Sequence, residues 1–306
     1  MPAPDRVEAT RTFGAETPEQ LLHRLEWQVI RRLDGLLQGR YRTAFRGVGL
    51  DFLDLREYEP GDDVRHIDWN VTARMDKLFV RQYSEDRELT AWLLLDRSPS
   101  MGFGPIGRPK EVVLGELATT FARLFTRSGN RVGAILFDNE IEETLPPRST
   151  RNQVLALARN LLRPPRVNGA VTDLTALLEF AVGVTRRRSL VVLISDFITT
   201  PGWEHPLLQL TERHEVVAIR LLDPAEYELP DAGVIVVEDA ETREQLVVDS
   251  SDGEFRRRLR EAGEHREAEL RSATLRAGVD ICEVSTADDL VEALVRVVES
   301  RKRRRR

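Results

Sequence analysis

The chain has 306 residues, of which 41% are hydrophobic and 31% are charged, a composition that indicates a globular protein rather than a disordered or membrane-spanning one. The net charge is −6, and the last six residues are all basic, so removing their six charges leaves −12 on residues 1–300. Such an acidic chain argues against nucleic acid as a partner, because phosphates bind to basic surfaces. The single cysteine, Cys282, and the five scattered histidines argue against a disulfide framework and against a zinc site.

The first residues give no sign of a targeting segment. Residues 1–11 contain Pro, Asp and Glu, whereas a secretory signal has basic residues followed by an apolar run. The longest apolar runs have the length of a strand, far below the roughly 20 residues of a membrane-spanning helix. The sequence therefore predicts a cytoplasmic location.

Residues 1–90 are expected to form an N-terminal helix followed by an irregular segment. Thr17-Pro18-Glu19 predicts a helix start with Thr17 as the cap, and leucines at helical spacing continue the helix toward Gly39. Residues 40–88 combine glycines, paired charges and short apolar stretches, which predicts irregular strands and turns. Their aromatic and aliphatic side chains are too numerous for a linker, so we expect this segment to dock on the domain that follows.

Residues 91–300 have the pattern of an α/β domain with a doubly wound, mostly parallel sheet. Continuous apolar runs of strand length occur at 91–95, 132–137, 190–194, 216–222 and 279–284. Helical spacing of apolar residues occurs at 110–127, 152–161, 174–184, 204–213, 252–276 and 287–300. A hairpin is expected from 233–237 and 245–249, and a basic tail at 301–306. Because strands alternate with helices, we expect a parallel sheet with helices on both faces.

Short polar residues follow two of the predicted strands. Asp96-Arg97-Ser98-Pro99-Ser100 comes after the first strand, Ser195-Asp196 comes after the third, and the helix between them begins near Thr172. Ligands of such sheets bind beyond the carboxyl ends of the strands. Two carboxylates and three hydroxyls are hard oxygen ligands that suit Mg²⁺ or Mn²⁺. The predicted metal ligands are Asp96, Ser98, Ser100, Thr172 and Asp196.

Each part of this pattern also has a simpler explanation. The serines after the first strand and Thr172 are residue types that commonly cap the next helix. Thr175 is an alternative to Thr172 as the hydroxyl ligand. The prediction depends on the combination of the three parts, each at its expected strand or helix end.

The combination resembles the von Willebrand factor A domain with its metal-ion-dependent adhesion site. Asp96, Ser98 and Ser100 match the Asp-x-Ser-x-Ser element of that site, Thr172 matches its threonine, and Asp196 matches its second aspartate. Pro99 stands where glycine is frequent. The resemblance implies a Rossmann-like fold for residues 91–300 and a bound ion that recruits an acidic side chain of a partner protein.

A second resemblance covers the segment before this domain. Residues 54–69 and 77–83 are similar to the signature of bacterial family fifty-eight of the domains of unknown function, and the two resemblances together span about residues 20–300. Members of that family are often encoded beside MoxR-type AAA+ ATPases and are associated with the maturation or activation of other proteins. The resemblance implies a MoxR-type ATPase or its client as the partner that donates the acidic side chain.

The signature contains polar residues of its own. Pro60-Gly61 followed by two aspartates predicts a tight turn. A second metal site is the alternative use of Asp62, Asp63, His66 and Asp68; ion pairs with Arg56, Arg65 or Arg74 are the simpler interpretation.

The expected function is a metal-dependent protein-binding module rather than an enzyme. No His or Cys lies in 96–100, 172–174 or 195–197, and acid–base catalysis needs a proton-transferring group within hydrogen-bond reach. The alternatives are a Mg²⁺-dependent phosphohydrolase with Asp96 as nucleophile and a structural scaffold with a vacant site. Against the phosphohydrolase, Ser98 replaces the second aspartate of the aspartyl-phosphate pattern, and no lysine is expected beside the third strand. The tail at 301–306 is either a weak contact to an anionic surface or a solvated end.

Overall fold

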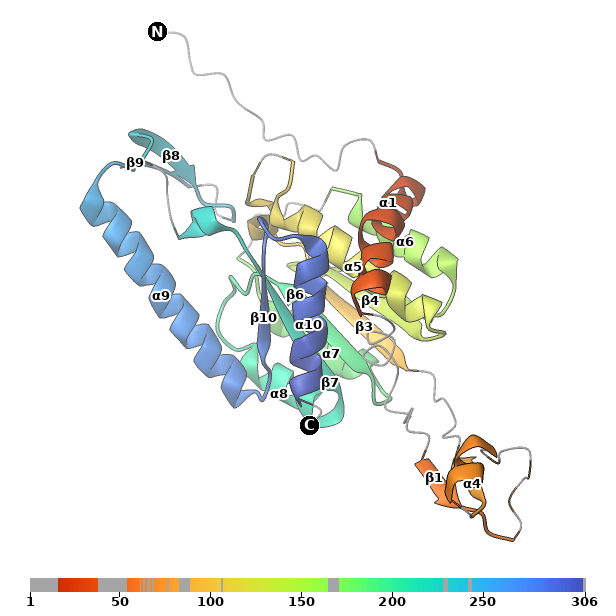
Figure 1. Ribbon diagram of the computed structural model, residues 1–306. Coiled ribbons are helices and arrows are strands. Elements are labelled where there is room, and N and C mark those ends of the chain that lie inside the picture. The colour runs from red at the N-terminus through yellow and green to blue at the C-terminus, as the bar shows by residue number, and fades with distance from the viewer. Residues whose placement is uncertain are drawn as a thin grey trace.

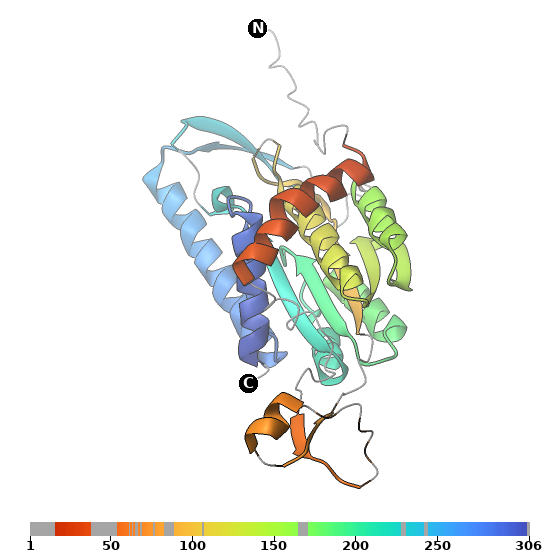
Figure 2. The ribbon, with the colours of Figure 1, turned by 45° about the vertical axis from the view of Figure 1, so that its right-hand side comes forward.

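The computed structural model describes residues 16–37, 54–60, 62, 64, 67, 69–75, 77–82, 89–105, 107–164, 171–227, 231–241 and 244–304. Its centre is a six-stranded sheet with helices on both faces (Figures 1 and 2). In spatial order the strands are β10 (Ile281–Ser285), β7 (Glu215–Leu222), β6 (Leu190–Ser195), β3 (Thr90–Asp96), β4 (Arg131–Asp138) and β5 (Glu140–Arg148). All neighbours are parallel except β4 and β5, so the expected α/β fold with a mostly parallel sheet is confirmed.

Strand β3 shows why the strands of this sheet are continuous apolar runs. Leu93 and Leu95 belong to the hydrophobic core on one face of the sheet, and Trp92 and Leu94 belong to the core on the other face. Successive side chains of a strand point to opposite faces. A strand that is covered on both faces is therefore apolar at every position.

The helices form two layers, one on each core. The first core is covered by α1 (Pro18–Leu25), α5 (Lys110–Arg127), α6 (Arg151–Leu161) and α10 (Leu290–Arg304), and the second by α7 (Leu174–Val184), α8 (Glu204–Arg213) and α9 (Gly253–Arg276). The predicted helices are confirmed, with ends that differ by a few residues. Helices on both faces bury β3, β4 and β6, whereas the edge strand β5 stays partly exposed along its length.

The predicted N-terminal helix is present and packs on the sheet domain. The Thr17 side chain accepts a hydrogen bond from the Gln20 N–H (3.2 Å), and the Gln20 Oε1 accepts one from the Thr17 N–H (2.7 Å), which completes a capping box. After α1 the chain passes through a π-helical turn (Glu26–Ile30) into α2 (Arg31–Leu37). The buried leucines of α1 belong to the same core as those of α5, so this helix is part of the sheet domain.

The segment before β3 forms a small unit of its own, made of β1 (Asp54–Glu57), α4 (Trp69–Met75) and β2 (Phe79–Gln82), with β1 and β2 antiparallel. In both views it lies apart from the central sheet (Figures 1 and 2). The expected docking of 40–88 on the sheet domain is therefore wrong for the described residues. Ile67 and Val80, both buried, form an antiparallel β-bridge through their backbones, so they pair within the unit.

The turn predicted at Pro60-Gly61 is confirmed at its two ends. The Asp62 N–H donates to the Glu59 carbonyl oxygen (3.1 Å), and Asp62 Oδ2 accepts from the Glu59 N–H (2.9 Å). Asp62 is thus a turn residue. The other members of the alternative second metal site, Asp63, His66 and Asp68, lie outside the described residues, so that hypothesis stays untested.

The C-terminal part differs from the expectation at its end. Strands β8 (Val234–Glu238) and β9 (Gln245–Asp249) form the predicted hairpin. Helix α10, however, continues to Arg304, and Arg301 is buried within it and paired with Glu215. The expected basic tail does not begin at Arg301, because burial and this charged partner hold the residue in the helix.

Candidate functional site

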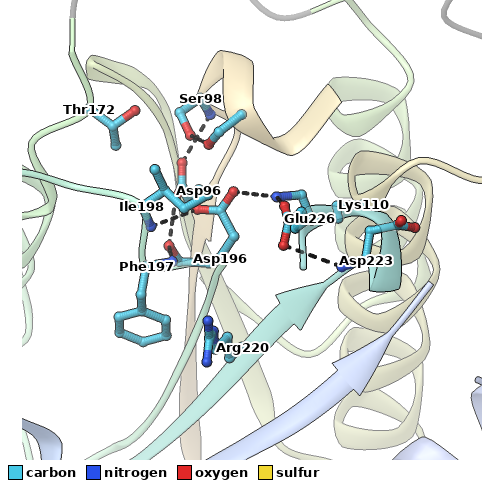
Figure 3. Close-up of polar contacts among 12 residues, drawn as sticks. Asp96, Ser98, Lys110, Thr172, Asp196, Phe197, Ile198, Arg220, Asp223 and Glu226 are labelled. Atoms are coloured by element: carbon cyan, nitrogen blue, oxygen red, sulfur yellow. Dashed lines mark hydrogen bonds and ion pairs between the residues drawn. The ribbon is translucent and has the colours of Figure 1, made fainter. Parts of the chain in front are cut away.

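The two predicted aspartates meet at the carboxyl ends of neighbouring strands. Asp96 is the last residue of β3, Asp196 follows the last residue of β6, and β3 and β6 are paired in the sheet. The Ser195 Oγ donates to Asp96 Oδ2 (2.6 Å) and so links the two strand ends. Both aspartates are almost fully buried, with 0% and 2% of their surface exposed. Figure 3 shows their carboxyl groups in the same small region.

The chain turns sharply after Asp196. Phe197 has φ +59°, in the left-handed region that costs a non-glycine residue roughly 1–2 kcal/mol. The turn lets the Ile198 N–H donate to Asp196 Oδ1 (3.0 Å), and it places the Phe197 ring edge-on against Trp203, 5.6 Å between centroids. The position of Asp196 is thus fixed by its own loop.

The two serines lie beside Asp96 and do not cap a helix. The Ser98 N–H donates to Asp96 Oδ1 (2.9 Å), and the two hydroxyl oxygens of Ser98 and Ser100 are 3.1 Å apart. Ser98 precedes a 3-10 turn (Pro99–Gly102), but its hydroxyl makes no capping hydrogen bond to a backbone N–H of that turn. Helix capping therefore does not explain these serines, and their buried hydroxyls face the aspartates.

Thr172 is also free of the capping role. Asp173 caps α7 instead, with its Oδ1 accepting from the Thr175 N–H (2.9 Å). The Thr172 carbonyl oxygen accepts from the Thr200 N–H (3.0 Å), which ties its loop to the loop after β6. In Figure 3, Thr172 and Ser98 lie on the same side of the aspartates. The alternative residue, Thr175, is inside α7 and is partly exposed, so the structure favours Thr172.

Burial of two carboxylates so close together has an electrostatic cost. Burial first, and the charge of Asp196 second, raise the pKa of Asp96 to about 7. A cation placed between the two aspartates would favour the charged form of both.

Lys110 is a residue of the candidate site that the sequence analysis missed. It is the first residue of α5, is 0% exposed, and its Nζ donates to Asp196 Oδ2 (2.6 Å) and also to Glu226 (Figure 3). Burial alone would lower the pKa of Lys110, but the charges of Asp196 and Glu226 outweigh it and hold the pKa above its ordinary value. The expectation that no lysine lies beside the third predicted strand, now β6, is wrong.

The sequence does hold a signal for Lys110. The first turn of a helix carries positive partial charge and disfavours cations. A lysine at the first position of a long helix is out of place unless carboxylates compensate it, as Asp196 and Glu226 do here.

Glu241 is the second residue that the sequence analysis missed. It lies in the turn between β8 and β9, is 8% exposed, and accepts two hydrogen bonds from Thr172, one at Oε2 from the N–H (2.7 Å) and one at Oε1 from the Oγ1 hydroxyl (2.5 Å). Nothing in the sequence indicates this contact, because 69 residues separate the two partners.

The donor set fits a hard divalent cation. Two carboxylates and three hydroxyls offer only oxygen atoms, which Mg²⁺ and Mn²⁺ prefer. In the described part of the chain no group of three or more His, Cys, Asp or Glu side chains is arranged to hold a metal ion. The candidate site therefore depends on its hydroxyl ligands as much as on its carboxylates.

Comparisons with known proteins agree with the resemblance to family fifty-eight of the domains of unknown function. The family model described as "Protein of unknown function DUF58" matches residues 54–269. The chain is 35% identical over 286 residues to the uncharacterized protein Rv1480 of Mycobacterium tuberculosis. This match covers 92% of the chain and 89% of Rv1480.

Two solved structures are similar over 70% of this chain and 99% of their own length. One is the conserved hypothetical protein BatB from Bacteroides thetaiotaomicron, with a TM-score of 0.44 and 14% identity. The other is an aerotolerance-related membrane protein from Bacteroides fragilis, with a TM-score of 0.45 and 15% identity.

The expected cytoplasmic location is corrected by these comparisons. One of the similar structures is that of a membrane protein, and another, from Vibrio fischeri, is described as an uncharacterized membrane spanning protein. Within the described ranges, no helix is both long enough and apolar enough to cross a bilayer.

Proposed function

The chain belongs to the DUF58 family of proteins of unknown function, and on that premise we propose that it is a metal-dependent protein-binding module of the von Willebrand factor A type. The observation that carries the proposal is the pair of buried aspartates, Asp96 and Asp196, beside the hydroxyls of Ser98, Ser100 and Thr172. These five residues would hold Mg²⁺ or Mn²⁺. The bound ion would supply a positive charge that an acidic side chain of a partner can coordinate.

The proposed partner is a MoxR-type AAA+ ATPase or its client, with this protein as the adaptor in maturation or activation of the client. The support is the resemblance of residues 54–69 and 77–83 to the signature of a family whose members are often encoded beside such ATPases. Hydroxyl ligands are neutral, so an ion held largely by them keeps attraction for an incoming carboxylate. That attraction grows where water is excluded, because the effective dielectric constant falls on burial.

A binding role accounts for the site better than phosphate hydrolysis does. The aspartyl-phosphate pattern has a second aspartate two residues after the nucleophile, where this chain has Ser98, and the Asp96 carboxylate is 0% exposed. Lys110 could in principle hold a phosphate, but it is fully buried between Asp196 and Glu226. We therefore propose a protein without catalytic activity.

Calorimetric titration of the full chain with Mg²⁺ and Mn²⁺ tests the proposal. We expect saturable binding to the parent and none to Asp96→Ala, with the far-ultraviolet circular dichroism of the two proteins unchanged. Asp252→Ala, which removes the cap of α9 away from the site, is the matched control and should bind like the parent. Equal metal affinity in the parent and in Asp96→Ala would show that the ion is held elsewhere.

A pull-down tests the partner. The neighbouring ATPase, tagged and mixed with this protein, should be retained in Mg²⁺ and lost in EDTA, and the double variant Ser98→Ala, Ser100→Ala should weaken the complex by more than tenfold, about 1.4 kcal/mol. A complex of the same affinity in EDTA and in Mg²⁺ would contradict metal-dependent binding and favour the alternative of a structural scaffold with a vacant site.

A further inference from the structure

The two outer strands of the central sheet differ in how open they are to a further strand. β5 contains Pro146 and Pro147, and its register with β4 shifts at two places. Prolines and bulges prevent an edge strand from pairing with another chain. β10 contains no proline and pairs with β7 in an unbroken register from Ile281 to Ser285, and its other side has no paired strand among the described residues. β10 is therefore the open edge strand of the sheet.

The backbone of β10 presents hydrogen-bonding groups to its outer side. The Thr286 N–H donates toward β7 (3.0 Å), whereas the Ser285 N–H donates away from β7, to Asp288 Oδ2 (2.9 Å). Backbone groups of successive residues in a strand point to opposite sides, so those of Ile281 and Glu283 point outward like that of Ser285. Within the described ranges, no acceptor is bound to the N–H of Ile281 or Glu283. Both residues are free to bond a further strand.

A groove of about 840 Å³ lies along this outer side, lined by residues of α9, β10 and α10. In Figure 1, β10 lies between these two helices. Leu275 of α9 lines the groove and is 69% exposed, and Val279 and Ile281 add apolar surface beside it. The groove can therefore cover side chains of an added strand while β10 bonds its backbone.

The groove has an excess of negative charge. Its charged lining residues are five carboxylates and two guanidinium groups, namely Glu267, Asp280, Glu283, Asp288, Glu299, Arg271 and Arg296. Both arginines are already paired with acids of the same groove. Asp280 and Glu299 form no ion pair in the described part of the chain. The charge of the groove thus complements a basic segment.

We propose that the outer side of β10 is a docking site for an extended, basic segment of a partner protein, which adds a strand to the sheet. Hydrogen bonds to the backbone of Ile281 and Glu283 supply affinity, and the carboxylates select lysine or arginine at alternate positions. A second copy of this chain fits less well, because pairing two β10 strands brings two acidic grooves together, and like charges repel. The groove shares no residue with the candidate metal site, so this docking does not depend on a metal ion.

Fluorescence anisotropy of a labelled octapeptide that alternates valine with arginine tests the docking on the full chain. We expect saturable binding that EDTA leaves unchanged. Glu283→Lys should weaken it by about tenfold or more, because a repulsive charge replaces an attractive one. Glu264→Lys makes the same charge change at an exposed residue of α9 that does not line the groove, and should bind like the parent. Equal affinities of the two variants would overturn the proposal.

Amide hydrogen exchange separates strand addition from adhesion by charge alone. The peptide should slow the exchange of the Ile281 and Glu283 N–H groups by about tenfold or more, and change that of Ser285 little, since Asp288 already accepts from it. Binding without this protection would overturn the added strand. Protection of the same amides without peptide, together with a dimer in sedimentation, would make a second copy the occupant and overturn the choice of partner. Neither result bears on metal binding at Asp96.

Discussion

We call the side of the central sheet where its parallel strands begin the amino edge, and the side where they end the carboxyl edge. Buried charge is compensated differently at these two places. At the amino edge, Glu215 at the start of β7 pairs with Arg301 of α10, with Arg301 Nη2 donating to Glu215 Oε2 at 3.0 Å. The neighbouring His214 accepts from the Ser189 N–H through Nδ1 (3.3 Å), and burial first and the charge of Arg213 second lower its pKa, which favours the neutral form. The charge of Glu215 is thus compensated by Arg301.

At the carboxyl edge, carboxylates outnumber their cation. Asp96, Asp196, Glu226 and Glu241 gather there, and among the described residues Lys110 is the cation that forms ion pairs with members of this group. Buried charge that is not compensated lowers stability and is rarely kept without another use. The difference between the edges is that the described charge of the amino edge is paired one to one, whereas several carboxylates of the carboxyl edge share the single ammonium of Lys110.

Removing the cation of the carboxyl edge should have the largest effect. Lys110→Met leaves Asp196 and Glu226 without their charged partner, and breaking such a buried pair costs about 3–5 kcal/mol of the free energy of unfolding. Urea unfolding measures the loss. Arg108→Met, two residues earlier and partly exposed, is the control and should cost less than about 1 kcal/mol. A loss for Lys110→Met as small as that of the control would mean that Lys110 does not compensate the aspartates.

Removing the cation Arg301 at the amino edge should lower the free energy of unfolding by less than Lys110→Met does, and this loss should not depend on metal. Arg301→Met leaves Glu215 unpaired, but that carboxylate keeps 22% of its side-chain surface in water, so we expect a loss of about 1–3 kcal/mol. Differential scanning calorimetry with and without Mn²⁺ distinguishes the edges: the ion should raise the melting temperature of Arg301→Met and of the parent equally. A smaller gain in Arg301→Met would connect the two edges and contradict the comparison.

The smallest effect concerns the pH dependence of stability. Because the pKa of His214 is lowered on folding, its contribution to stability is complete above its unfolded pKa of about 6.5 and is lost as the pH falls below that value. His214→Gln keeps an acceptor for the Ser189 N–H and should unfold with a shallower loss of stability between pH 6.5 and 5. Parallel curves for parent and variant over that range would show that His214 protonates equally in both states.

The sheet could be predicted from the sequence because its strands are local apolar runs. The run from Ala91 to Leu95 is buried on both faces and needs no knowledge of its neighbours to be recognised. Strand β5 was not predicted, since Pro146-Pro147 and several glutamates interrupt any apolar pattern. An edge strand with shifted register tolerates them, because one side of it has no partner to bond.

The part of the candidate site that follows the strands could be predicted from the sequence in the same way. Asp96, Ser98, Ser100 and Asp196 sit directly after buried strands, so strand prediction alone gathers them at one edge. Glu241 and Lys110 reach the site from a hairpin turn and from a helix start, and such contacts follow from tertiary packing rather than from spacing. The expected docking failed for the described residues of 54–82 for a related reason, because composition shows that a segment is apolar but not where it packs.

The contact between Phe197 and Trp203 gives the site a spectroscopic reporter. Of the four tryptophans, Trp27 and Trp69 are more than half exposed, whereas Trp92 and Trp203 are buried in the core on the same face of the sheet. The emission of the folded chain thus combines a long-wavelength part from the exposed indoles with a short-wavelength part from the buried ones. Since Trp203 touches the residue next to Asp196, a ligand that shifts the Asp196 loop changes the quantum yield of the short-wavelength part, and the occupancy of the site can be followed by light without any label.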